Sequence, residues 1–469
     1  MPKSCLVGID IGTSRVKALV FDLDGRELSD GHVETPWRIT SSGAEAEPDE
    51  LYKAVLDAVR LALRATPEGT VAGVGVTGMA EAVALLGKRG EAVAPTIAWF
   101  DERGEEERTE LERDVGDARF AALTGLPVSR LATIVKLRWM LRHFPDAPSA
   151  RCMLSVPEYI AYRLGGERAA EPSLASRTGL FDVNSESWSA ELLEWVGLPD
   201  DVFPDAVAAG SVLGRVVDRS SELERLRGAA IALGGHDHLC AAVGSGVISQ
   251  KEVLNSCGTA EAYVRSVAPL DGNDLIAAVA NGVCVGRHVL PNRQAILGGR
   301  PFGLVLAPVY DLLGWSDVSG IDAASSERTR DEAADMANGE SAGEGAHGRL
   351  GVALSFSFDV VTGRSSFTGI GPGVSAKRAR AVAIEEVLRR SFKLYEAVAG
   401  IGGPVERVVM TGGWARSEPL ATRKAERFPA ACWVTVREPG ARGAALFAGH
   451  AAGLLSGPEG FPAAPLELS

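Results

Sequence analysis

Two aspartates that stand beside glycines are the residues of this sequence best placed to do chemistry. Asp237 follows two glycines and lies between two histidines, and Asp10 ends a predicted strand just before a Gly-Thr turn. Glycines before an acidic residue let the backbone bend sharply and present one carboxylate at the mouth of a cleft. Asp237 is therefore a candidate base.

Two Gly-Thr turns are candidate phosphate-binding segments. Gly12 and Thr13 separate two apolar runs, and Gly258 and Thr259 do the same in the second half of the chain. Such a turn leaves backbone N–H groups free to meet phosphate oxygens. The repeated arrangement of strand, Gly-Thr turn and strand suggests a duplicated domain.

Alternating strand and helix patterns around these turns predict an α/β fold. The predicted helices include residues 48–64, 133–143, 239–243 and 441–453, and the predicted strands include 5–10, 16–22, 71–76, 82–86, 252–255, 260–264, 408–410 and 432–436. Residues 323–348 are rich in Ala, Glu, Ser and Gly and predict an exposed excursion. The tail after Ser456 carries three prolines, and we expect it to be loosely held.

Bulk composition narrows the possible partners. A chain of 469 residues is too long for one core, so two large domains are expected. The net charge of −13 argues against nucleic acid or an anionic membrane as the main partner. The six cysteines form no CxxC pair, no run approaches ~18 apolar residues, and no signal peptide is recognisable. We expect a cytoplasmic protein with reduced thiols.

Simpler interpretations compete with the chemical ones at each motif. His236 and His238 would share a face of a strand, but a zinc site needs further ligands, and none are patterned nearby. The Asp10 segment alone is equally consistent with a strand, a turn and a solvated acid. Glycines before a helix, as at Gly412 and Gly413, are common. The order of all these segments along the chain is harder to obtain by chance.

In that order the sequence resembles the FGGY carbohydrate kinases, which belong to the actin/Hsp70/sugar-kinase superfamily. The matching segments are GIDIGTSRVKALVFD at 8–22, PTIAWFDER at 95–103, TIVKLRWMLRH at 133–143, EPSLASRTGLFDVNSESWSAELLEWVGLP at 171–199, GGHDHLCAAVGSG at 234–246, MTGGWARS at 410–417 and GARGAALFAG at 440–449. Each segment is modest alone, and together they cover most of the chain.

The resemblance implies an α/β fold of two ribonuclease-H-like (actin-like ATPase) domains with a central cleft, where ATP and a sugar meet. The N-terminal domain would be residues 1–246, with the sugar site, the first phosphate hairpin and the catalytic aspartate. Residues 247–469 would hold the second phosphate hairpin and the adenosine site. Such kinases move the γ-phosphoryl group of ATP to a hydroxyl of a sugar, a polyol or a sugar acid.

The same resemblance assigns roles to individual residues. Asp237 would accept the proton of the substrate hydroxyl, and Asp10 would orient Mg²⁺, with catalytic and metal-binding roles. The residues expected to bind ATP are Gly12, Thr13, Ser14, Lys17, Gly258, Thr259, Gly299, Gly412, Gly413 and Ser417. For Lys17 a solvated strand end is an equal alternative.

The substrate site implied by the resemblance comprises Met79, Ala80, Glu81, Trp99 and His236, together with Asp237. Xylulose kinases usually have Met-His where this chain has Ala80-Glu81, and glycerol kinases have Arg-Glu. The aromatic residue that glycerol kinases place before the signature helix is Leu131 here. Glu81 suits hydrogen bonds to neutral hydroxyls and disfavours a sugar carboxylate, so we expect a neutral ketose or polyol.

Three points stay open. The Gly-Glu-Arg loop usual in the family is not recognisable at residues 347–350, which leaves open part of the active-site wall and whether the chain is a monomer or a homodimer. Another ATPase of the actin-like fold, such as a filament former, is an alternative function. A non-catalytic regulator that binds sugar and nucleotide is a third, although the presence of both Asp10 and Asp237 argues against it.

Overall fold

The computed structural model describes residues 4–41, 43–66, 69–217, 221–258, 260–314, 354–358 and 364–468. The chain forms two compact units, each assembled from separate segments. Unit 1 consists of Met1–Glu252, Val264–Leu297 and Val436–Pro465, and unit 2 consists of Val253–Tyr263, Gly298–Thr435 and Leu466–Ser469. The predicted excursion at 323–348 lies outside the described residues. The predicted assignment of roles to residues 1–246 and 247–469 stays a prediction.

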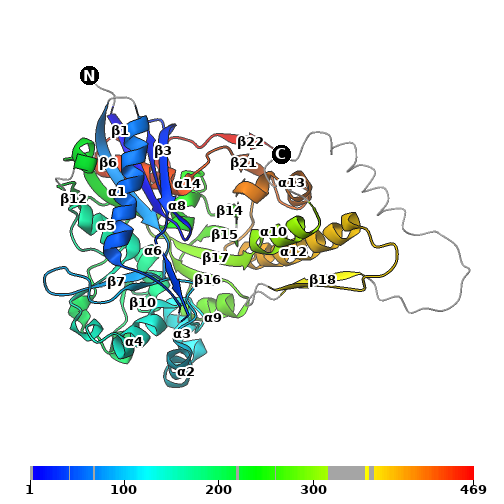
Figure 1. Ribbon diagram of the computed structural model, residues 1–469, viewed down its shortest axis with the longest axis horizontal. Helices are drawn as coiled ribbons and strands as arrows, with labels where there is room; N and C mark the ends of the chain where they lie inside the picture. The colour runs from blue at the N-terminus through cyan, green and yellow to red at the C-terminus, as the bar shows by residue number, and fades with distance from the viewer. Residues whose placement is uncertain are drawn as a thin grey trace, which may run out of the picture. The chain divides into compact units, whose positions relative to one another are not determined.

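A six-stranded sheet forms the centre of unit 1, in the order β12-β13-β6-β1-β2-β3 (Figure 1). Its strands are β1 (Ser4–Ile11), β2 (Arg15–Phe21), β3 (Glu27–Glu34), β6 (Thr70–Gly78), β12 (Gly214–Arg215) and β13 (Ala230–His236). The first three strands form an antiparallel meander, and β6 and β13 continue the sheet parallel to β1. This order is that of a ribonuclease-H-like sheet.

The two faces of this sheet are packed in different ways. On β1 the residues Val7, Ile9 and Ile11 belong to a large apolar core together with α1 (Pro48–Ala65) and α5 (Val156–Leu164). On the other face, Leu6 packs with residues of α14 (Pro439–Ala451). The alternation of side chains along a strand therefore divides β1 between two layers of helices.

Glycines allow α14 to approach the sheet very closely. A Cβ on Gly8 of β1 would overlap the backbone of Ala441, and a Cβ on Gly75 of β6 would overlap that of Ala444. Gly73 faces Ala448 in the same way. The helix backbone thus rests on the strand backbones, an approach that only glycine permits.

The remaining elements of unit 1 surround this sheet and a second apolar core. They are β4 (Arg38–Thr40), β5 (Gly43–Ala46), β7 (Val83–Leu86), β8 (Thr96–Ile97), α2 (Glu105–Asp114), α3 (Asp117–Thr124), α4 (Thr133–His143), β9 (Cys152–Ser155), α6 (Pro172–Ala175), β10 (Phe181–Asp182), β11 (Ser187–Trp188), α7 (Ala190–Val196), α8 (Asp237–Gly244), α9 (Gly272–Ala280) and β16 (Cys284–Arg287), with short 3₁₀ turns η1 (Ala147–Ser149), η2 (Ser176–Thr178), η3 (Asp200–Val202), η4 (Ser221–Leu226) and η7 (Pro458–Gly460).

Unit 2 contains the second large sheet, in which the strands follow the order β17-β15-β14-β20-β21-β22. Its elements are β14 (Glu252–Cys257), β15 (Ala260–Val267), β17 (Gln294–Pro301), α10 (Gly303–Leu312), β18 (Ser355–Phe358), β19 (Ser365–Thr368), α12 (Ala376–Ala399), β20 (Arg407–Thr411), η6 (Gly413–Arg416), α13 (Glu418–Ala425), β21 (Cys432–Val434) and β22 (Leu466–Leu468). In unit 1, β16 pairs antiparallel with the first part of β17.

Most of the predicted elements are confirmed, and the prediction for the tail is wrong. The helix predicted at 133–143 has the same bounds in the structure, and the helix predicted at 48–64 ends one residue later. In the tail, the carbonyls of Pro462 and Ala463 accept hydrogen bonds from Arg442, and β22 pairs with β21. The tail is held because a buried arginine and a strand edge both need its backbone groups. Within the described part of the chain, no helix is long and apolar enough to cross a membrane.

The contact between α14 and the sheet makes a prediction about stability. Gly75→Ala would force the added methyl group into the carbonyl of Ala444. We expect the free energy of unfolding to fall by about 1–3 kcal/mol, as for overpacked cores. Chemical denaturation of the purified variant measures this change.

The matched control is Gly272→Ala in α9 of the same unit. There the nearest atom to an added Cβ is 3.6 Å away, an ordinary contact distance. This variant should unfold within about 0.5 kcal/mol of the wild type. Equal effects of the two substitutions would show that the helix is not held by close backbone contact.

Candidate active site

Asp237 occupies a sharp turn between a strand and a helix. β13 ends at His236, and α8 begins at Asp237 itself. Before it, Gly235 has φ +79°, and its carbonyl accepts a hydrogen bond of 2.6 Å from Thr77 Oγ1. Another side chain does not fit at Gly235, because a Cβ there would approach Ser173 Oγ to 2.5 Å. The turn therefore fixes Asp237 at the end of a central strand, as predicted from the two glycines.

The neighbours of Asp237 hold its side chain in the ionised form. His236 Nε2 lies 3.1 Å from Asp237 Oδ1, and the backbone N–H of His238 donates to the same oxygen at 2.6 Å. Burial acts to raise the pKa of Asp237, but His238 and His236 outweigh it and lower the pKa to about 2. At neutral pH this carboxylate is a proton acceptor.

Asp10 lies on the face of β1 that meets α14. Its environment raises the pKa of its carboxyl group, whereas the pKa of Asp237 is lowered. A Cβ on Gly440 would be only 2.9 Å from Asp10 Oδ2, so the start of α14 covers the carboxyl group. Burial and then the charge of Asp237 raise the pKa of Asp10 to about 7, while Lys17 opposes them. Asp10 Oδ1 is buried and has no hydrogen-bond partner in the described part of the chain. The two carboxyl groups thus differ in their affinity for a proton, as in many acid–base sites.

Lys17 is held in an ion pair and is not a solvated residue at the end of a strand. It lies opposite Asp10 in the register of β1 and β2, and its Nζ is 2.5 Å from Glu438 Oε2. Glu438 directly precedes α14. Burial favours the neutral amine, but Asp10 and Glu438 outweigh it and raise the pKa of Lys17. The ammonium group stays charged beside the Asp10 carboxyl.

The residues at Asp10 fit Mg²⁺ better than zinc. The described residues contain no group of three or more His, Cys, Asp and Glu side chains that could hold a metal ion. His236 Nε2 faces Asp237, which does not support a zinc site at the two histidines. Mg²⁺ is commonly held by one or two carboxylates, water and substrate phosphates. The buried, unpartnered oxygen of Asp10 would suit such an ion.

The predicted first phosphate hairpin is braced through its carbonyls. Gly12 O accepts a hydrogen bond from Thr35 Oγ1 at 2.8 Å, and Thr13 O accepts one from Trp37 Nε1 at 2.8 Å. Ser14 O accepts from the backbone N–H of Thr35. The N–H groups of Thr13 and Ser14 donate to no described residue. The turn is therefore fixed while these two donors remain available to an anion.

Trp99 is held at both its ring and its backbone. Its Nε1 donates to Thr13 Oγ1 at 2.7 Å, which joins a predicted substrate residue to a predicted phosphate residue. Its carbonyl accepts a hydrogen bond from the Nζ of Lys136, a buried lysine that also donates to Leu131 O at 3.3 Å. Burial lowers the pKa of Lys136 to about 8.

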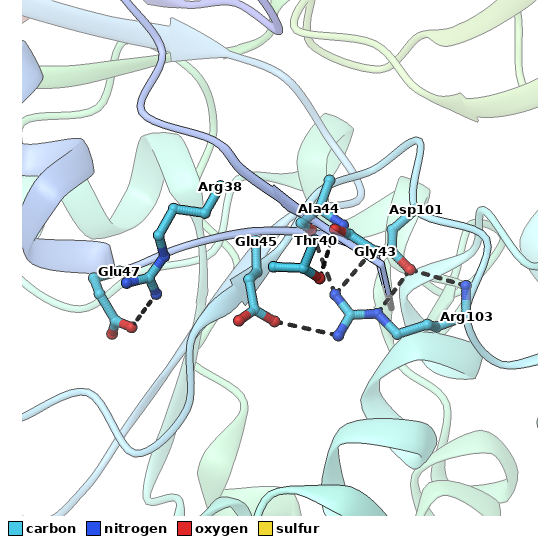
Figure 2. A network of polar contacts seen from close by, with 8 residues as sticks. All are labelled: Arg38, Thr40, Gly43, Ala44, Glu45, Glu47, Asp101 and Arg103. Atoms are coloured by element: carbon cyan, nitrogen blue, oxygen red, sulfur yellow. Dashed lines mark hydrogen bonds and ion pairs between the residues drawn. The ribbon is translucent and has the colours of Figure 1, made fainter.

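An arginine clamp fixes the loop that follows Trp99 (Figure 2). Arg103 Nε donates to Asp101 Oδ1 at 2.9 Å and Arg103 Nη2 donates to Asp101 Oδ2 at 2.8 Å, in the bidentate arrangement that suits a guanidinium. Arg103 Nη1 reaches Glu45 Oε2, and the N–H of Ala44 donates to Asp101 Oδ2 at 2.7 Å. These contacts join the loop to the β4–β5 hairpin.

The three predicted substrate residues after β6 differ in their surroundings. Met79 belongs to the apolar core, and Ala80 is buried. Glu81 has a left-handed backbone with φ +59° and forms an ion pair with Arg177. Of these three, Glu81 alone carries a polar side chain, so any polar contact from these side chains comes from it.

In unit 2 two of the predicted nucleotide residues, Gly258 and Gly412, lie at the end of β14. The N–H of Gly258 donates to Ala260 O at 2.9 Å, and Gly412, with φ +97°, packs against Cys257 so closely that a Cβ would overlap it. Gly413 has open space around it, whereas Ser417 is buried. Two further predicted residues are Gly299, which is exposed on β17, and Thr259, which lies outside the described residues.

A buried lysine supports this end of β14. Lys424 Nζ pairs with Glu261 Oε1 and lies 2.8 Å from Asn255 Oδ1 and 3.0 Å from Cys257 Sγ. Lys424 and Glu261 are each 1% exposed. Lys424 comes from α13, which follows the Gly412–Gly413 segment, so one ammonium group connects this helix to the strand before Gly258.

Two buried carboxyl groups support the end of β13, just before Asp237. Glu171 accepts hydrogen bonds from the N–H groups of Ser173 and Leu174, and Ser173 Oγ in turn accepts one from the N–H of His236 at 2.9 Å. Glu158 accepts from the N–H of Glu171 at 2.8 Å. Burial raises the pKa of Glu158 and of Glu171 to about 7 each.

The sheet order and the hairpin beside Asp10 define an α/β fold with a ribonuclease-H-like sheet, as predicted. The chain belongs to the FGGY family of carbohydrate kinases, because the N-terminal domain of that family matches residues 5–244, more than half of the chain.

Individual relatives are similar over part of their length. A xylulose kinase of Streptomyces rubiginosus is 32% identical over 282 residues, which are 59% of this chain and 57% of that protein. An autoinducer-2 kinase of Klebsiella pneumoniae is 30% identical over 269 residues, 55% of this chain and 50% of that protein. The chain therefore spans little more than half the length of these curated relatives. The solved structure of a ligand-bound xylulose kinase from Lactobacillus acidophilus is similar in fold, with a TM-score of 0.80 and 18% identity over 99% of this chain and 93% of that chain.

Sequence reasoning did not single out several residues of the site. Glu438, Arg177 and Lys424 all act through ion pairs with partners distant in sequence. Arg177 does lie inside the quoted segment 171–199, and Glu438 stands just before the Pro-Gly start of a predicted buried helix. A charged residue in an otherwise apolar or helix-starting segment is the signal that would have found both.

The buried carboxyl groups make the stability of the fold depend on pH. Their folded pKa of about 7 lies above the usual value of about 4.3, so the unfolded chain loses these protons first as pH rises. We expect the free energy of unfolding to fall between about pH 4.5 and pH 7, by up to about 1.4 kcal/mol per pH unit for each group, and then to level off. Urea denaturation from pH 5 to pH 8 measures this slope.

Glu158→Gln should reduce that slope because it removes one titrating group. Glu167→Gln, an exposed position on the neighbouring segment, is the control and should leave the slope unchanged. A slope in Glu158→Gln equal to that of the wild type would contradict the buried-proton explanation.

The lysine of unit 2 makes a further prediction. Lys424→Met leaves the Glu261 carboxylate buried without its counter-ion. We expect a loss of about 3–5 kcal/mol in the free energy of unfolding, as for broken buried pairs. The double variant Glu261→Gln/Lys424→Met should recover part of that loss, since no unpaired charge remains.

The control for Lys424→Met is its neighbour Arg423→Met, which breaks the ion pair with Glu385 nearer the surface. That change should cost no more than about 1 kcal/mol. Equal losses at the two positions would mean that the buried charge of Lys424 is not what stabilises unit 2.

Proposed function

We propose that this protein is an ATP-dependent carbohydrate kinase, which transfers the γ-phosphoryl group of ATP to a hydroxyl of a neutral ketose or polyol. The observation that carries the proposal is the pair of unlike carboxyl groups, Asp237 held ionised and Asp10 with a buried free oxygen. Family membership and relatives named xylulose kinase and autoinducer-2 kinase support it.

Asp237 would act as the general base. Phosphoryl transfer needs in-line positioning and charge neutralisation more than covalent chemistry. A carboxylate with a pKa of about 2 does not take a proton from a resting hydroxyl. It accepts that proton as the oxygen bonds to phosphorus, when the hydroxyl becomes acidic. His236 and the N–H of His238 hold the carboxylate in place through its Oδ1 until then.

The cofactors would be ATP and Mg²⁺. Asp10 would hold the ion through its free oxygen, and bound Mg²⁺ neutralises charge on the phosphates. Lys17, already paired with Glu438, would stabilise the nearby negative charge. The free N–H groups of Thr13 and Ser14, and the Gly258–Thr259 turn, would bind phosphate oxygens. Gly412, Gly413, Gly299 and Ser417 would form the adenosine site.

The proposed roles of the chain segments follow the resemblance. Residues 1–246 would bind the sugar and supply the base, and residues 247–469 would bind the adenosine. Met79, Ala80, Glu81, Trp99 and His236 would line the sugar site. A cytoplasmic location remains a prediction. Whether the protein is a monomer or a homodimer stays open.

The test is ADP release from ATP and Mg²⁺ in the presence of ketoses, polyols, aldoses and sugar acids. We expect turnover with a neutral ketose or polyol. Asp237→Asn should lower that rate at least about 10²-fold, since it removes the general base. Asp201→Asn, an exposed change of the same chemistry, is the control and should keep full activity.

Each other result has a definite meaning. Sugar-dependent activity that survives in Asp237→Asn would refute the role of Asp237. ATP binding without turnover on any compound would favour the non-catalytic regulator. Nucleotide-dependent sedimentation would favour a filament-forming ATPase.

A further inference from the structure

The proposed mechanism gives no role to Arg177, which forms an ion pair with Glu81 of the proposed sugar site. Arg177 Nε and Nη2 lie 2.7 Å and 2.6 Å from the same oxygen, Glu81 Oε1. The side chains of Glu81 and Arg177 are 12% and 18% exposed, so the pair is mostly removed from water but still reachable. The two charges cancel, and the local charge is close to zero.

The backbone at Glu81 is held in an unfavourable conformation. Its φ of +59° is rare for a residue with a side chain, and such strain concentrates at functional sites. Met79, two residues earlier, is fixed by a hydrogen bond from its N–H to Ile11 O and by burial in the core. From this backbone the Glu81 carboxylate meets Arg177, which comes from the separate 3₁₀ turn η2.

The pair lies beside the proposed base. His238, next to Asp237 in sequence, interacts electrostatically with both Glu81 and Arg177. The segment that carries Arg177 begins with α6, whose Ser173 accepts a hydrogen bond from the N–H of His236. β6 and β13 are parallel neighbours, and Gly78 pairs with His236, so Glu81 and Asp237 follow adjacent strand ends at the same edge of the sheet, while Arg177 reaches Glu81 from η2.

We propose that Arg177 is a specificity-determining residue of the sugar site, and that Glu81 occupies its guanidinium so that anionic sugars are rejected. This inference rests on the proposed function. A neutral pair offers a carboxylate acceptor and N–H donors side by side, which matches neighbouring hydroxyls of a ketose or polyol. A sugar carboxylate would meet the Glu81 charge and find two of the arginine donors already used.

Removal of Glu81 reverses this preference. A mostly buried guanidinium without a counter-ion is costly, and a ligand carboxylate supplies both the charge and the bidentate geometry that arginine favours. Anionic sugars would then be rejected because Glu81 is paired with Arg177. The sequence alone had suggested that the negative charge of Glu81 by itself rejects them.

The experiment compares Glu81→Gln with the wild type on a neutral polyol and its acid of equal carbon number, xylitol and xylonate. Calorimetry measures binding of each compound in the presence of ADP and Mg²⁺, and kcat/KM is measured on the best neutral substrate of the panel and its aldonate. Glu81→Gln should shift the neutral-to-acid ratio towards the acid by at least about 10-fold. Arg177→Met in the same background should abolish the gain, because the binding cation is gone.

Two further variants separate specificity from folding. Arg177→Lys keeps the charge but loses the two-point contact, and should raise KM for the neutral substrate with kcat within about threefold. Glu191→Gln breaks an exposed pair with Arg119 and should leave the ratio unchanged. If Glu81→Gln does not fold, the KM effect of Arg177→Lys decides the matter.

An unchanged neutral-to-acid ratio in folded Glu81→Gln overturns the proposal, as does acid binding that persists after Arg177→Met. The binding measurements do not depend on turnover. A wild-type protein that is inactive on every compound would refute the kinase proposal, while the xylonate affinity of Glu81→Gln would still test the role of Arg177.

Discussion

The contact between the backbone of α14 and the central sheet is the constraint on which the rest of unit 1 depends. Gly8, Gly73 and Gly75 leave no space for a side chain beneath the helix. The next residue after Gly8 on the same face of β1 is Asp10, and Gly440 in the first turn of the helix lies against its carboxyl group. The small residues therefore do more than permit packing, because they set how deeply the Asp10 carboxyl is buried.

The same helix also positions Asp237. Gly244 at the end of α8 meets Pro439 so closely that no Cβ fits, and Gly443 meets Cys240 of α8 in the same way. Arg442 adds hydrogen bonds to Gly25 O at 3.0 Å and to Gly244 O at 2.8 Å. α8 and β1 thus both pack against α14. This shared contact keeps Asp237 and Asp10 close enough for the charge of Asp237 to raise the pKa of Asp10.

Much of this arrangement could be predicted from the sequence, because it depends on residues that are close together in the chain. The helix at 133–143 and the turn before Asp237 follow from periodicity and from glycine positions. The ion pairs could not be predicted, since their partners stand far apart. Glu81 and Arg177 are 96 residues apart, Lys17 and Glu438 are 421 apart, and Lys424 and Glu261 are 163 apart. No spacing rule connects such residues, and only the folded topology brings them together.

The two Gly-Thr hairpins are held in shape by different contacts. In both, a glycine N–H donates back across the turn, from Gly12 to Arg15 O and from Gly258 to Ala260 O. The first hairpin is braced by side chains that bind its carbonyls, with Trp37 and Thr35 as donors. The strand before the second is braced by the Lys424 ammonium group. An anion-binding turn must present its N–H groups without collapsing onto itself, and any bracing that spares those donors serves equally well. The repeated turn is therefore visible in the sequence, whereas its bracing is particular to each unit.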